Sequence, residues 1–227
     1  MTVGLISLAL IPVVILIAFI YLADRHNREP ARLLWKVFLY GFLVSVPVIG
    51  IQFFLIRLNF FPGLLSMAFQ AFIIAALTEE YMKRFVVVKI AYRNPAFDEK
   101  LDGIIYCAFA ALGFAAIENI LYVFRYFPSD PSIAFYRAIF SVPGHMLFAI
   151  TMGYYLALSK FAGSPGDCRR YYGKSLLYPV LLHGTFNFIL STEVSFLLVF
   201  LPFVIFMWIF NMKKLNAFYR ESKANHS

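Results

Sequence analysis

Charged side chains are scarce in this sequence. Asp, Glu, Lys and Arg make up 14% of the 227 residues, whereas soluble domains carry about a quarter. Hydrophobic residues make up 62%, and several apolar segments reach the roughly 20 residues that a helix needs to cross a hydrocarbon core. Every stretch between these segments is short. The composition therefore excludes an ordinary soluble protein and leaves no room for a separate soluble domain.

Cysteine is also scarce. Cys107 lies in an apolar segment and Cys168 in a short basic loop, and their positions lack the spacing of metal ligands. Any metal site must therefore be built from His, Glu and Asn. A cleavable signal peptide is not expected, because the first apolar run (3–22) is too long, lacks an early positive charge and is followed by no small-residue cleavage site. We expect this run to form the first spanning helix.

The pattern of apolar segments predicts an all-α integral membrane protein. We expect about seven transmembrane helices, with eight as the alternative, and an active site in the interior of the bundle. The chain is treated as a single polytopic domain (1–227) with a catalytic core at 64–191. The predicted spans are 3–23, 33–55, 64–92, 103–125, 133–159, 174–191 and 194–212.

Lys and Arg residues concentrate on one side of these spans. Of the 20 in the chain, all but Arg57, Arg125 and Arg137 fall on the side that follows spans 1, 3, 5 and 7. Because Lys and Arg are retained in the cytoplasm, we predict an N-terminus outside the cell and a cytoplasmic C-terminus. The net charge of +8 is then explained by topology and lipid headgroups, so no nucleic-acid partner is expected.

Ionisable residues interrupt four of the spans at a similar depth. The stretch LTEEYMKRF places Glu79 and Glu80 near the middle of the third span, and Glu118 lies in the fourth. His145 and His183 lie near the centres of the fifth and sixth. At about 1.5 Å of rise per residue, these histidines and Glu79 fall within ~3 Å of the centre of their spans. Ionisable groups in a membrane are costly and indicate a functional site.

Helical spacing adds partners to these groups, because residues four apart share a helix face. The pairs with this spacing are Glu79 with Lys83, Glu80 with Arg84, and His183 with Asn187. Each carboxylate would then have a cation one turn away, which lowers the cost of keeping it ionised. Pro143 should kink the fifth span beside His145.

Two chemical interpretations suit carboxylates and imidazoles in a layer of low dielectric constant. Imidazoles and carboxylates can bind Zn²⁺ with water in an open position, and a second carboxylate can accept the proton of that water. Alternatively, a carboxylate activates water without a metal while His and Asn stabilise the oxyanion. Each group also has a structural interpretation, as a helix-end charge or an interhelical hydrogen bond. Four such groups in one layer favour a functional site.

The motifs resemble those of the PrsW family of membrane proteases. They are EExxK at 79–83, GFAAIEN at 113–119, the isolated His145 and HGTFN at 183–187, and they extend from the third span to the sixth. The resemblance implies a membrane-embedded endopeptidase of a bacterial plasma membrane. The family's type member cleaves a single-pass anti-sigma factor, so the implied partners are such a substrate and the lipid bilayer.

The family looks distantly related to the CAAX prenyl endopeptidase and Abi group. That group has EExxxR, FxxxH and HxxxN motifs, and the first and last match here at 79–84 and 183–187. The middle motif differs, because Glu118 stands where the relatives have His. This difference makes the processing of prenylated proteins an unexpected activity for the chain.

The resemblance suggests hypotheses for individual roles. Glu79 is expected to act as the general base, and Glu80, held by Arg84, to support it or to bind metal. His145, His183 and Glu118 would hold Zn²⁺, or would position water if no metal binds. The expected catalytic residues are Glu79, Glu80, Glu118, His145, His183 and Asn187, with Lys83 and Arg84 in support. Asn187 would stabilise the tetrahedral oxyanion.

Two other classes of function stay open at this stage. Intramembrane Glu and His also form proton relays, so a proton-coupled transporter is the alternative. No inverted repeat of the kind found in many carriers is evident. A scaffold that binds membrane helices without chemistry is the third class. The oligomeric state, the substrate and the cut site are not predicted by the sequence.

Overall fold

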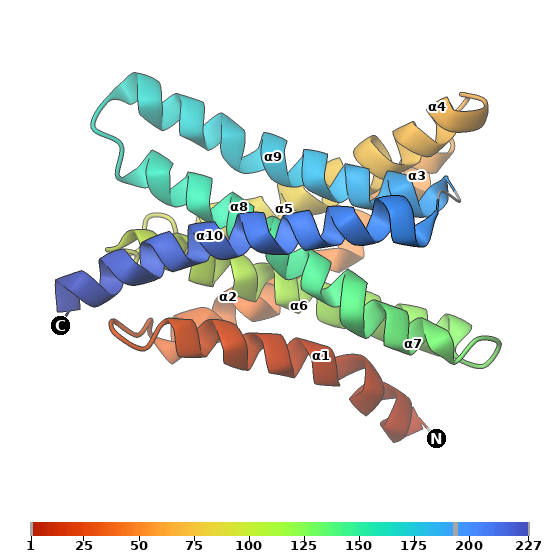
Figure 1. Cartoon of the computed structure of the whole chain (residues 1–227), viewed down its shortest axis with the longest axis horizontal. Helices are drawn as coiled ribbons and strands as arrows, with labels where there is room; N and C mark the ends of the chain where they lie inside the picture. The colour runs from red at the N-terminus through yellow and green to blue at the C-terminus, as the bar shows by residue number, and fades with distance from the viewer. Residues whose placement is uncertain (1, 193–194, 227) are drawn as a thin grey trace.

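The computed structural model describes residues 2–192 and 195–226, and within these ranges the chain is helical without any strand. Figure 1 shows long helices that run back and forth between two ends of the molecule. The α-helices are α1 (Thr2–Ala23), α2 (Ala31–Leu43), α3 (Ser45–Ile56), α4 (Gly63–Ala68), α5 (Thr78–Ile90), α6 (Lys100–Tyr126), α7 (Ser132–Tyr136), α8 (Val142–Lys160), α9 (Pro165–Ser191) and α10 (Leu201–His226). The π-helical segments are η1 (Phe69–Leu77), η2 (Arg137–Ser141) and η3 (Phe196–Phe200). The prediction of an all-α membrane protein is confirmed.

Several predicted spans consist of consecutive helical pieces. The second predicted span is α2 followed by α3, the third combines α4, η1 and α5, and the fifth combines α7, η2 and α8. The π-helical segment η2 ends two residues before Pro143, which lies in the first turn of α8, and the kink expected at Pro143 stays a prediction.

By length and apolar composition, six helices within the described ranges could cross a membrane. They correspond to the predicted spans 1 to 5 and 7. The seventh predicted span begins at residue 194, outside the described residues, and its helix continues to His226, well past the predicted end. The sixth predicted span (174–191) lies in α9, which is not among the six. A count of seven crossings therefore stays a prediction.

Helix α6 forms the centre of the molecule, and α1, α2 and α8 pack around it. Every residue from Leu101 to Ala116 is buried. Helices α6 and α8 approach each other closely, because a Cβ on Gly153 would overlap the backbone of Gly103. Large apolar side chains face outward on the peripheral helices, including Val14 and Phe53. Such a surface suits lipid, which solvates apolar side chains as well as a protein interior does.

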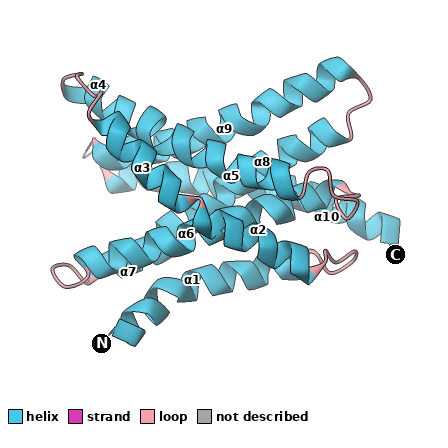
Figure 2. Cartoon of the chain, turned by 180° about the vertical axis from the view of Figure 1, so that it is seen from behind, coloured by secondary structure: helices cyan, strands magenta, loops and turns pink. Residues whose placement is uncertain are grey.

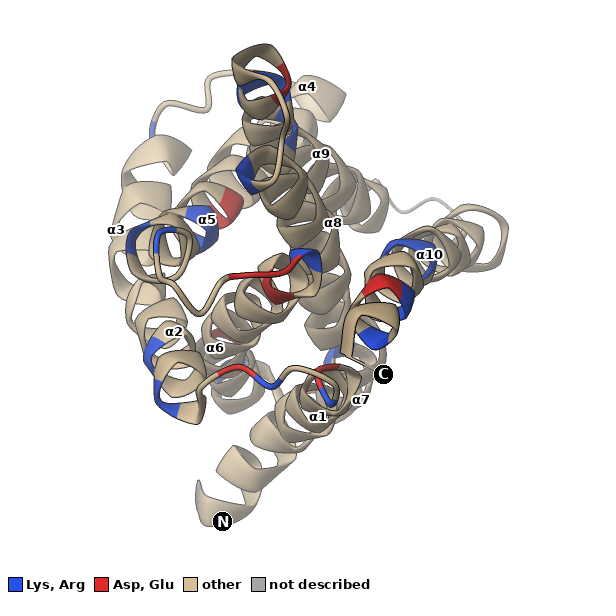
Figure 3. Cartoon of the chain, turned by 90° about the vertical axis from the view of Figure 1, so that its left-hand side faces the viewer, with Lys and Arg blue, Asp and Glu red and all other residues tan. Residues whose placement is uncertain are grey.

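The basic segments gather at one end of the molecule. Figure 3 looks onto this end, where Lys and Arg are seen at the connections between α1 and α2, α5 and α6, and α8 and α9, and along the end of α10. The opposite end holds the N-terminus and the α6–α7 connection, as seen from behind in Figure 2. The charge asymmetry predicted from the sequence is therefore present in three dimensions.

Candidate active site

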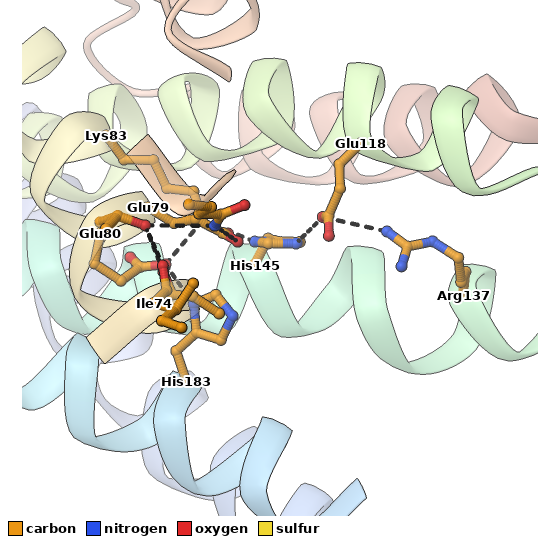
Figure 4. A network of polar contacts seen from close by, with 11 residues as sticks. Ile74, Glu79, Glu80, Lys83, Glu118, Arg137, His145 and His183 are labelled. Carbon is orange, nitrogen blue, oxygen red and sulfur yellow. Dashed lines mark hydrogen bonds and ion pairs between the residues drawn. The ribbon is translucent and has the colours of Figure 1, made fainter. Parts of the chain in front are cut away.

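Four helices bring their ionisable side chains together in the interior of the bundle. Glu79 and Glu80 lie in the first turn of α5, Glu118 lies in α6, His145 in α8 and His183 in α9. Figure 4 shows these side chains pointing toward one another. The groups predicted to share one layer are thus in one connected network.

Lys83 links the two adjacent carboxylates to His145. Its Nζ donates to Glu80 Oε1 at 2.8 Å and to Glu79 Oε2 at 3.3 Å, and lies 2.9 Å from His145 Nδ1. The lysine is 1% exposed and its ammonium lies 4.5 Å from the centre of the Phe114 ring. Burying charges is costly unless they are paired and hydrogen-bonded. Here one cation is shared between two buried carboxylates.

His145 uses both ring nitrogens. Because an ammonium can only donate, Nδ1 accepts from Lys83, and Nε2 therefore carries the proton and donates to Glu118 Oε2 at 2.7 Å. Arg137 Nη2 lies 3.2 Å from the same Glu118 oxygen. Its Nε also donates to Asn119 Oδ1 at 2.7 Å. A continuous polar chain thus joins α5, α8, α6 and η2.

His183 contacts Glu80 and the aromatic face of Phe148. Its Nδ1 lies 2.9 Å from Glu80 Oε1, and its ring stacks on Phe148 with centroids 4.7 Å apart. Because a carboxylate only accepts hydrogen bonds, Nδ1 carries the proton and Nε2 is the nitrogen with a free lone pair. His183 therefore has one nitrogen available to a substrate, to water or to a metal.

A cavity of about 1000 Å³ opens beside this network. Glu79, Glu118, His145, His183 and Asn187 all line it. All three π-helical segments also contribute to its wall. π-Helical turns occur frequently at functional sites. The cavity therefore has a wall of ionisable side chains within a mostly apolar lining.

Glu80 and Lys83 lie behind that wall. Neither lines the cavity, and they are 0% and 1% exposed. Glu79 lines it and receives a hydrogen bond from Gln52 Nε2 at 3.2 Å. Of the two adjacent carboxylates, Glu79 is therefore the one that can reach a bound substrate.

One sequence prediction about this site is wrong. Arg84 was expected to hold Glu80, but its Nη1 donates to the Tyr172 carbonyl at 2.9 Å and to Ser175 Oγ at 3.3 Å, both on α9. Its guanidinium also lies over the Tyr172 ring. The i,i+4 spacing permits a contact with Glu80, but the Arg84 side chain turns to α9, and Lys83 pairs with Glu80 instead.

Sequence reasoning missed two residues of the network. Arg137 was counted as a charge outside the membrane, although it lies within the predicted fifth span and is 7% exposed. That position was a signal, because a buried arginine needs a partner. Gln52 carries no charge and gave no comparable signal in the sequence.

The donor atoms suggest a different metal group from the predicted one. Among the described residues, one donor atom each from Glu79, Glu80 and His145 lie within 4.8 Å of one another. The predicted ligands His145, His183 and Glu118 do not form such a group. Two carboxylates and an imidazole suit Zn²⁺ by type. However, the Lys83 ammonium contacts all three residues, so a metal and the protonated lysine are alternatives at this position.

Comparisons with known proteins agree with the motif resemblance. The family model described as PrsW family intramembrane metalloprotease matches residues 29–212. A protein named Protease PrsW from Clostridioides difficile is 40% identical over 225 residues, which covers 98% of this chain and 94% of that protein. A protein of the same name from Oceanobacillus iheyensis is 38% identical, and the match covers 99% of this chain and 97% of that protein. Another from Bacillus subtilis is 33% identical, and the match covers 93% of this chain and 94% of that protein. No solved structure matches the chain significantly.

Proposed function

The chain belongs to the PrsW family of intramembrane metalloproteases. From that premise we propose that it cleaves a single-pass membrane protein, and that Glu79 activates the attacking water. The observation that carries the proposal is the separation of the two carboxylates. Glu79 lines the cavity, while Glu80 lies behind it. A general base must lie within hydrogen-bond reach of the water that it deprotonates.

The steps follow from the residues that line the cavity. A water oxygen attacks the scissile carbonyl carbon and gives a proton to a Glu79 oxygen. The developing oxyanion accepts hydrogen bonds from the Asn187 amide, which lines the same cavity one turn from His183. The carbon–nitrogen bond then breaks, and Glu79 returns the proton to the leaving amine. Water is consumed, a carboxylic acid and an amine are produced, and Glu79 is again a carboxylate.

The other residues hold this arrangement in place. Lys83 balances the charges of Glu79 and Glu80, and Glu80 fixes the orientation of the His183 ring. Glu118, held by Arg137, does the same for His145. Such supporting contacts keep a catalytic group in its productive geometry. His183 Nε2 faces substrate with its lone pair free.

The donor set at Glu79, Glu80 and His145 is of a type that fits Zn²⁺. A bound zinc would act as a Lewis acid and lower the pKa of its water toward neutrality. Zinc binding there requires that the Lys83 amine leave its three contacts. Purified protein should therefore take up zinc more tightly after Lys83→Met than before, as measured by equilibrium dialysis. Equal or weaker uptake would contradict a metal at this group.

The cavity favours a peptide segment of a membrane protein as substrate. Its wall is mostly apolar but includes the amides of Gln52, Gln70 and Asn187. An extended peptide in a water-poor site needs such partners, because each unsatisfied backbone group in a membrane costs several kcal/mol. We take the substrate to be a single-pass anti-sigma factor, as the motif resemblance implies. In this proposal the N-terminus lies outside the cell and the basic end faces the cytoplasm of a bacterial plasma membrane.

The experiment compares the membrane proteins of source cells that carry the intact protein or the Glu79→Gln variant at matched abundance. One or a few single-pass proteins should accumulate at full length in the variant. Glu221→Gln is the matched control, because this carboxylate lies far from the cavity in an exposed pair with Lys100. An unchanged fragment pattern under every envelope stress applied would contradict the proposal. Altered solute flux without uncleaved protein would favour the transporter alternative.

A further inference from the structure

A second group of carboxylates lies at the basic end of the molecule, away from the cavity. Asp24 follows α1, Glu29 precedes α2, and Glu99 and Asp102 lie at the start of α6. Figure 3 shows these acidic segments in the two connections that meet at this end. One carboxylate oxygen from each of Asp24, Glu99 and Asp102 lies within 4.8 Å of the other two. The proteolytic mechanism uses none of these residues.

The aspartates of this group are fully enclosed and only half hydrogen-bonded. Asp24 and Asp102 are both 0% exposed. Asp24 Oδ2 accepts from the Glu29 N–H at 2.8 Å, and Asp102 Oδ2 accepts from the Glu99 N–H at 2.8 Å. The Oδ1 atom of each aspartate is buried without a hydrogen-bond partner among the described residues. Leaving a buried acceptor unsatisfied costs about 1–3 kcal/mol, so each of these atoms points to a missing partner, which is either a cation or a proton.

The nearby cations bind elsewhere. Lys160 Nζ donates to the Tyr92 carbonyl at 2.7 Å, Lys100 pairs with Glu221 at 2.8 Å, and Arg28 lies over the Tyr21 ring. Within the described ranges, the ion pairs include no Lys or Arg with Asp24, Glu29 or Asp102. His226 approaches only Glu99, at 3.3 Å. The missing partner is therefore not a basic side chain of this structure.

We propose that Asp24, Glu99 and Asp102, with Glu29 beside them, bind one hard divalent cation of the Mg²⁺ or Ca²⁺ type. Both cations prefer oxygen ligands, and this group offers only carboxylate oxygens. The cation would tie the α1–α2 connection to the start of α6. These two connections already touch, because Asn27 Nδ2 donates to Asp98 Oδ1 at 3.1 Å. The proposed site is structural and is separate from the donor group at Glu79, Glu80 and His145.

The test uses the full chain in a nonionic detergent, stripped with a chelator, with Mn²⁺ alone as the spectroscopic probe. The background carries Glu79→Gln and His183→Ala, so that the candidate active site contributes no binding. Electron paramagnetic resonance should count one bound Mn²⁺ per chain, displaced by Mg²⁺ or Ca²⁺. In the unmodified chain, adding Mg²⁺ or Ca²⁺ should raise the unfolding temperature, because a ligand that binds only the folded state stabilises it.

Asp24→Asn and Asp102→Asn test the ligands separately, and each keeps an oxygen that can accept the backbone hydrogen bond. Each should weaken Mn²⁺ binding more than about tenfold, because the loss of an outer-shell partner alone already costs that much, and these aspartates are proposed as direct ligands. Asp167→Asn, an exposed carboxylate at the start of α9, should leave binding unchanged. If Asp102→Asn does not fold, Asp24→Asn decides. The proposal would be overturned if the Glu79→Gln, His183→Ala chain binds no Mn²⁺, or if neither aspartate variant changes its binding. The carboxylates at Asp24 would then be stabilised by protons that they share with one another.

Discussion

At the scale of single residues, Glu79 and Glu80 are adjacent in the sequence but have different surroundings. Glu79 meets the cavity and Gln52, whereas Glu80 is enclosed between Lys83 and His183. We expect Glu79→Gln to abolish cleavage and to cost less stability than Glu80→Gln, because the Glu79 contact with Lys83 is longer, at 3.3 Å against 2.8 Å, and Glu79 borders the cavity. Glu80→Gln should reduce cleavage and also destabilise the fold by about 3–5 kcal/mol, because it breaks a buried ion pair. Substrate cleavage at matched abundance and thermal unfolding of the purified variants measure the two effects. Equal losses of stability would contradict separate roles.

Arg137 has a positioning role in this network. It pairs with Glu118, which in turn holds the protonated nitrogen of His145. Arg137→Met should lower cleavage at least about tenfold, the usual scale for loss of a supporting residue, and should also lower stability. Adding Glu118→Gln to Arg137→Met should cost less stability than the two single changes added together, because coupled residues are not additive.

Arg125→Met is the control for the Arg137 variant, since Arg125 is exposed at the end of α6 and stacks on Tyr126. It should leave cleavage and unfolding temperature unchanged. If the stability losses of Arg137→Met and Glu118→Gln simply add, the two side chains do not act as a pair.

At the scale of helices, the site depends on the close contact between α6 and α8. Glu118 and His145 come from these two helices, and Gly153 meets Gly103 where they cross. Gly153→Ala should destabilise the fold by about 1–3 kcal/mol, the cost of overpacking, and should reduce cleavage by moving His145 away from Glu118. Gly173→Ala is the matched control, because nothing lies within 4 Å of the added carbon. In a helix that change should be neutral or stabilising by up to about 1 kcal/mol. Similar effects of both changes on unfolding would contradict the packing argument.

Helix boundaries were predictable where one apolar run has polar ends. The predicted spans 3–23 and 103–125 differ from α1 and α6 by three residues or fewer at each end. The division of other spans by η1 and η2 was not predictable, because a π-helical turn is set by packing against neighbouring helices.

Packing between helices also limits how much of the site could be predicted from the sequence. Depth in the membrane identified Glu79, His145 and His183 as one layer, but the rotation of each helix decides which atoms meet. Rotation turns Arg84 toward α9 and leaves Lys83 as the shared cation.

At the scale of the whole molecule, the predicted orientation can be tested with the chain's own thiols. Cys168 lies at the basic end and Cys107 is buried, whereas Ser129 is exposed in the α6–α7 connection at the opposite end. Because basic segments stay in the cytoplasm, a membrane-impermeant maleimide added to intact cells should spare Cys168 and label it only after lysis. Ser129→Cys, combined with Cys168→Ser, should be labelled on intact cells. Labelling of Cys168 from outside together with protection of Ser129→Cys would reverse the orientation, and would place the carboxylate group at Asp24 in the external medium instead of the cytosol.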